Sequence, residues 1–69
     1  MLNKNYKNLN PEEKEIAITR VSEYAHVSKE IIQKVLLEMN PVIDIINGKA
    51  AFYKNTLLRL HKKIESHTK

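Results

Sequence analysis

The chain has 69 residues and a mass of 8.1 kDa, a length that corresponds to one small domain. Its composition is 42% hydrophobic and 29% charged, which is typical of a globular protein rather than a disordered or fibrous one. The formal net charge of +4 is unevenly distributed. Residues 1–25 cancel to zero, residues 26–47 sum to −1, and the last third sums to +5. That last third would attract a polyanion such as a nucleic acid, although a solvated surface gives the same pattern.

Several function classes are disfavoured by what the chain lacks. One glycine and no cysteine leave no phosphate-binding loop, nucleophile elbow or thiolate metal site. His26, His61 and His67 show no metal-ligand spacing. We therefore expect no enzymatic activity, no cofactor and no metal. The longest apolar run is residues 50–53, and no signal-type stretch occurs near the N-terminus, so we expect a cytoplasmic protein without a membrane partner.

The first 25 residues predict an arm followed by helical structure. Residues 1–10 are rich in asparagine with little periodicity, which indicates a flexible N-terminal arm that Tyr6 can anchor. A helix begins after Asn10, because Pro11 at its first position and Glu13 complete a capping pattern. Residues 16–18 fit either a continued helix or a short strand. We favour a break there, with a new helix capped at Thr19.

The next segment predicts an amphipathic helix over residues 29–39, capped by Ser28. Its apolar stripe at helical spacing consists of Ile31, Ile32, Val35, Leu36 and Met39. Leu37 falls on the opposite, polar face. It is either a tolerated surface leucine or a contact for a thymine methyl group or another protein.

Residues 42–53 predict a β-hairpin around Asn47 and Gly48. Pairing Val42–Ile46 with Lys49–Tyr53 places Ile43 opposite Phe52 and Ile45 opposite Ala50. The alternative is a short helix that begins after Asn40-Pro41 and ends at Gly48. From Asn55 the stripe Leu57, Leu60 and Ile64 predicts a basic helix, with a frayed tail at residues 66–69.

The fold class that these elements predict is α+β. Residues 11–65 would form a small winged helix-turn-helix domain, with helices, a β-hairpin wing and a C-terminal basic helix. A small all-α bundle is the alternative. The hairpin region decides between the two.

Two stretches resemble known DNA-binding proteins. Residues 21–28, VSEYAHVS, resemble the helix-turn-helix of lac-repressor-type regulators, except that His26 stands where that family usually has a glycine in a left-handed conformation. Over residues 16–65 the order of elements resembles the winged helix-turn-helix of excisionases, which are recombination directionality factors, and of MerR-type headpieces. Residues 45–54, IINGKAAFYK, are similar to the excisionase wing.

The resemblance implies a sequence-specific DNA-binding protein of a mobile element, an excisionase or a small transcriptional regulator that binds and bends DNA without chemistry. Its partners would be double-stranded DNA, a recombinase (integrase) and further copies of itself on DNA. The implied DNA-binding residues are Ser28, Lys29, Glu30, Gln33, Lys34, Asn47, Gly48 and Lys49. Gln33 would read adenine, Lys34 guanine or a phosphate, and Ser28 would present its hydroxyl and nearby N–H groups to a phosphate.

Glu30 opposes this assignment unless it accepts from a cytosine amine or pairs with Lys34. The rival function is a small protein-binding module, such as a phage-type inhibitor or antirepressor. It would use the helix around Leu37 or the basic last helix against an acidic partner.

Overall fold

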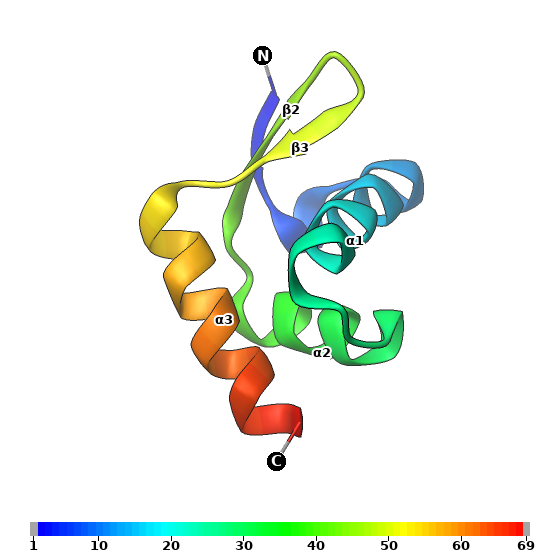
Figure 1. Ribbon diagram of the computed structural model, residues 1–69. Helices are drawn as coiled ribbons and strands as arrows, with labels where there is room; N and C mark the ends of the chain where they lie inside the picture. The colour runs from blue at the N-terminus through cyan, green and yellow to red at the C-terminus, as the bar shows by residue number, and fades with distance from the viewer. Residues whose placement is uncertain (1, 69) are drawn as a thin grey trace.

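In the computed structural model, which describes residues 2–68, the chain forms three α-helices and one three-stranded antiparallel sheet (Figure 1). The helices are α1 (Pro11–Ala25), α2 (Lys29–Met39) and α3 (Lys54–Thr68); the strands are β1 (Leu2–Asn5), β2 (Val42–Ile46) and β3 (Lys49–Ala51), and a 3-10 turn η1 (Tyr6–Asn8) follows β1. The predicted α+β class, with a hairpin after a helix-turn-helix pair, is confirmed. The all-α alternative is wrong.

Helix α1 is continuous, so the predicted break at residues 16–18 is wrong. The predicted cap is present: the Glu13 amide donates to Asn10 Oδ1 at 2.8 Å, and the Asn10 amide donates to the Glu13 carboxylate at 3.0 Å. Ala17, Ile18 and Val21 are buried at helical spacing. This spacing turns the three side chains toward one core. Their burial stabilises a continuous helix more than it would a helix that ended at residues 16–18.

The hairpin has the predicted turn. Asn47 and Gly48 have φ of 52° and 75°, and positive φ at both turn positions gives a two-residue turn whose twist matches that of the strands. Ile45 pairs with Ala50, as predicted. Strand β3 ends at Ala51, before the predicted partner Phe52. The reason is that the next helix begins at once, since the Tyr53 carbonyl accepts from the Leu57 amide at 3.0 Å.

The N-terminal segment corrects the expectation of a flexible arm. Its backbone forms β1, which pairs with β2 along its whole length. Tyr6 and Leu9 are 1% and 4% exposed and belong to the core. Asn40 holds the segment in place: its carbonyl accepts from Asn5 Nδ2 at 2.9 Å, and its Oδ1 accepts from the Lys7 amide at 3.0 Å. The domain therefore includes this segment, while Met1 lies outside the described residues.

The predicted frayed tail is also corrected, because α3 continues through Ser66 and His67 to Thr68. Lys69 lies outside the described residues.

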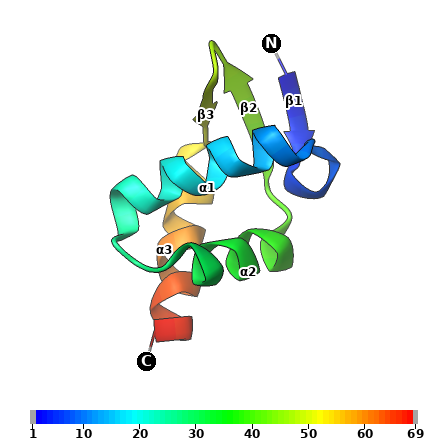
Figure 2. The ribbon, with the colours of Figure 1, turned by 90° about the vertical axis from the view of Figure 1, so that its right-hand side faces the viewer.

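The core lies where the three helices meet the inner face of the sheet. Helix α1 crosses the molecule between the sheet and α2, and α3 extends from the end of β3 to the side of α2 (Figures 1 and 2). The hydrophobic core cluster consists of Tyr6, Leu9, Ala17, Ile18, Val21, Ile32, Val35, Leu36, Ile43, Ala50, Leu60 and Ile64. The 3-10 turn η1, the three helices and strands β2 and β3 all contribute to this one cluster, and the backbone of β1 completes the sheet.

Tyr6→Ala tests the role of the N-terminal segment. Removing this ring from the core leaves a cavity and should lower the free energy of unfolding by about 3 kcal/mol or more. Urea denaturation followed by circular dichroism measures the change. Lys7→Ala is the matched control, because Lys7 is exposed and, among residues 2–68, only its backbone amide is bonded. Equal stability of the two variants would contradict the burial of Tyr6.

Candidate nucleic-acid interface

Helices α1 and α2 form a helix-turn-helix through the three residues 26–28. His26 adopts the left-handed conformation, with φ 52° and ψ 38°, at the C-terminus of α1. Its amide donates to the Ser22 carbonyl at 3.4 Å. Ser28 then caps α2, since its Oγ accepts from the Ile31 amide at 3.4 Å. The left-handed position expected at His26 is thus confirmed, and it turns the chain sharply enough for α2 to pack on α1.

The two faces of α2 have opposite characters. Ile32, Val35 and Leu36 are completely buried. The opposite face is exposed and carries Lys29, Glu30, Gln33, Lys34 and Leu37. Within the described part of the chain, Gln33 and Lys34 have no hydrogen-bonded or ionic partner, so their polar groups are available to a ligand. Pairing with Lys34 was one of the two ways in which Glu30 would be compatible with DNA contact, and this ion pair is not formed among residues 2–68.

Lys29 has a partner that sequence reasoning missed. Its Nζ lies 3.1 Å from the Glu15 carboxylate of α1. The two residues are 14 positions apart, so only the packing of α2 on α1 brings them together. Both side chains are about 60% exposed, and the pair is therefore a weak surface contact that a phosphate can replace.

The hairpin tip does not lie on the same surface as α2. Asn47, Gly48 and Lys49 are exposed, as expected. However, α1 packs against β3 on one side and α2 on the other, so it separates the tip from α2 (Figure 2). The tip faces α1 across a shallow cleft of about 280 Å³ lined by Glu15, Ile16, Thr19, Arg20, Glu23, Gly48, Lys49 and Ala50. The eight predicted site residues thus form two separate groups.

Charge distinguishes the surroundings of the two groups. Helix α1 has a formal charge of −2, from four glutamates against Lys14 and Arg20. Helix α3 has +3, from Lys54, Arg59, Lys62 and Lys63 against one glutamate, with histidines neutral. Helix α2 is neutral overall. A polyanion on α2 is therefore repelled on the α1 side and attracted on the α3 side.

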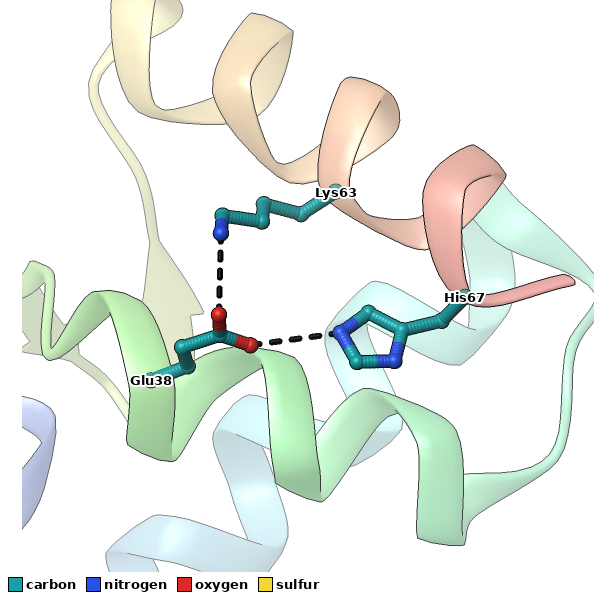
Figure 3. A network of polar contacts seen from close by, with 3 residues as sticks. All are labelled: Glu38, Lys63 and His67. Carbon is teal, nitrogen blue, oxygen red and sulfur yellow. Dashed lines mark hydrogen bonds and ion pairs between the residues drawn. The ribbon is translucent and has the colours of Figure 1, made fainter.

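Glu38 links α2 to α3 (Figure 3). Its carboxylate accepts from Lys63 Nζ at 2.9 Å and lies 3.2 Å from His67 Nε2. The hydrogen bond from Lys63 is the main reason that the pKa of Glu38 falls below its ordinary value of 4.5, and the contact with His67 adds to this effect. Sequence reasoning missed this network, because its members are 25 and 29 residues apart and carry no joint motif.

A basic groove lies beside this network. Four residues of α3 and one of α2 line it: Arg59, Lys62, Lys63, Ser66 and Met39. Its volume is about 510 Å³. The sequence signal for it is the spacing i, i+3, i+4, i+7 of the four α3 residues, which places them on one helix face. That signal identifies the face of α3 but not its neighbour on α2.

Comparison with known proteins gives no relative: no family model matches the chain, and neither a curated protein sequence nor a solved structure is significantly similar to it. Among residues 2–68, no helix is both long and apolar enough to cross a bilayer. In the same range, no cluster of three or more histidine, cysteine or acidic side chains is placed to hold a metal ion.

Glu38→Gln should destabilise the protein in a pH-dependent way. The folded state lowers the pKa of Glu38, so its contribution to stability is complete above the ordinary value and is lost as pH falls through the folded-state value. We expect the melting temperature of the variant to be below that of the wild type at neutral pH. The two should converge in acid.

Thermal denaturation at a series of pH values measures this difference. Glu30→Gln is the matched control, since Glu30 is also exposed on α2 but has no ionic partner among the described residues. A difference between wild type and Glu38→Gln that persisted unchanged into acid would contradict the stabilising role of the Glu38 carboxylate.

Proposed function

We propose that this protein binds double-stranded DNA sequence-specifically by placing α2 in the major groove. The observation that carries the proposal is the exposed pair Gln33 and Lys34 on α2, neither of which has a partner within residues 2–68. The opposite face of the same helix is buried in the core. A rigidly held helix with free polar groups on its outer face has the form required for reading base edges.

The chemistry of each exposed side chain of α2 favours a particular contact with DNA. The Gln33 amide donates and accepts together, as the major-groove edge of adenine requires, and Lys34 donates to guanine or a phosphate. Leu37 lies four residues after Gln33, on the same face, and is 39% exposed. It fits a thymine methyl group. Glu30 accepts from a cytosine amine and repels sites that offer none.

The start of α2 favours phosphate contact. Ser28 and Lys29 stand at its N-terminus, where unpaired amides and the helix dipole favour an anion. The Ser28 oxygen accepts the capping bond, so its hydroxyl proton remains able to donate. These contacts would set the orientation of α2 on the duplex without reading sequence.

The biological role within this proposal rests on the resemblance to excisionases and on the hairpin that follows α2. An excisionase-like or regulatory protein of a mobile element would bind and bend its site without chemistry, alone or with a recombinase and further copies of itself. The rival function, a protein-binding module, has in its favour the exposed side chains of Leu37 and Leu58, which are 39% and 57% exposed.

Selection of binding sites from a library of random duplexes tests the proposal. We expect enrichment of one sequence, followed by saturable binding in fluorescence anisotropy that is stronger on this sequence than on a scrambled duplex. Affinity should fall steeply with salt. Equal binding to both duplexes would contradict sequence-specific recognition. Absence of binding at low salt would overturn the DNA proposal and favour the protein-binding module.

Gln33→Ala tests base reading by α2. Loss of a bidentate contact should reduce discrimination at one base pair by about 1–3 kcal/mol, while affinity for the scrambled duplex stays unchanged. Competition anisotropy with single-base variants of the selected site measures this. Asn55→Ala is the matched control, because it removes an exposed amide from α3. A variant that kept full discrimination at every position would exclude Gln33 from base recognition.

A further inference from the structure

Two side chains of the basic groove are available to an anion. Within residues 2–68, Arg59 and Lys62 form no ion pair, whereas Lys63 is held by Glu38. Both line the groove next to the Ser66 side chain, whose hydroxyl can donate. Guanidinium and ammonium groups with a nearby hydroxyl form the donor set that binds phosphate oxygens. The groove is therefore suited to a phosphodiester, and its apolar lining residue Met39 can contact the sugar.

The groove adjoins α2 and not the hairpin tip. Helix α3 packs against α2, and Figure 3 shows Lys63 and His67 reaching from α3 to Glu38 near the end of α2. Met39, the last residue of α2, lines the groove itself. A duplex that received α2 in its major groove would therefore bring its backbone toward this part of α3.

The hairpin tip lacks an excess of cations. Lys49 shares its cleft with Glu15, Glu23 and Arg20 of α1, and Arg20 is paired with Glu23, so a phosphate there meets as many carboxylates as cations. A duplex that spanned α2 and the tip would also have to cross α1, which has a net charge of −2.

We infer that this protein makes its second contact with the DNA backbone through Arg59 and Lys62 of the α3 groove. This contact takes the role that the sequence predicted for the hairpin tip. This inference rests on the proposed DNA-binding function. Glu38 holds Lys63 at the edge of this groove, which leaves Arg59 and Lys62 as the groove cations for the phosphate.

The test compares two double variants with equal change in charge. Arg59→Gln/Lys62→Gln removes the two groove cations that Glu38 does not hold, and Lys49→Gln/Lys54→Gln removes two exposed cations outside the groove, one at the hairpin tip and one at the start of α3. Anisotropy with the selected duplex and its scramble, from about 50 to 200 mM salt, gives the dependence of log K on log salt. Circular dichroism verifies that both variants are folded.

We expect the groove variant to reduce the slope by about 2, because each lost phosphate contact removes about 0.9. The affinity for the selected duplex and for its scramble should fall by the same factor, so that the preference for the selected site is unchanged. The control variant should keep the wild-type slope. An unchanged slope in the groove variant, or an equal loss in both variants, would overturn the inference while leaving DNA binding intact. Failure of the wild type to bind any duplex would instead overturn the proposed function.

Discussion

Burial of one face of α2 is the constraint on which the rest of the structure depends. Ile32, Val35 and Leu36 are completely buried, and the helix packs against α1, α3 and η1 at once. Because these three residues fix the rotation of α2 about its axis, they also determine that Gln33 and Lys34 face outward. The direction of the proposed recognition face is therefore a consequence of the core, and a change in core packing would alter the direction of these exposed side chains.

Charge is distributed asymmetrically over the surface of this small protein. Its acidic helix, α1, and its basic helix, α3, lie on different sides of the neutral α2. The contacts Lys29–Glu15 and Lys63–Glu38 tie α2 to both neighbours. Since exposed pairs of this kind are weak, their effect is to orient side chains more than to stabilise the fold. A polyanion on α2 is guided toward α3, which is why α3 and not the hairpin tip completes the proposed interface.

Features that depend on a few neighbouring residues were predictable. The capping residues Asn10 and Ser28, the left-handed position at His26 and the turn at Asn47-Gly48 all appear as expected. All the predicted residues of the candidate site are exposed. Local prediction failed at residues 16–18, where the β-branched isoleucines suggested a strand. Burial of Ala17 and Ile18 against the core overrides that preference.

The sequence by itself determined the helix caps, the hairpin turn and the division of α2 into an apolar and a polar face, because each is set by residues within a few positions along the chain. Only the tertiary structure decided the pairing of β1 with β2, the burial of Tyr6 and the network around Glu38, because their partners are 25 or more residues distant and follow no shared motif. It also decided that the hairpin tip and α2 lie apart. That separation arises from the packing of α1 between them, which no local pattern encodes.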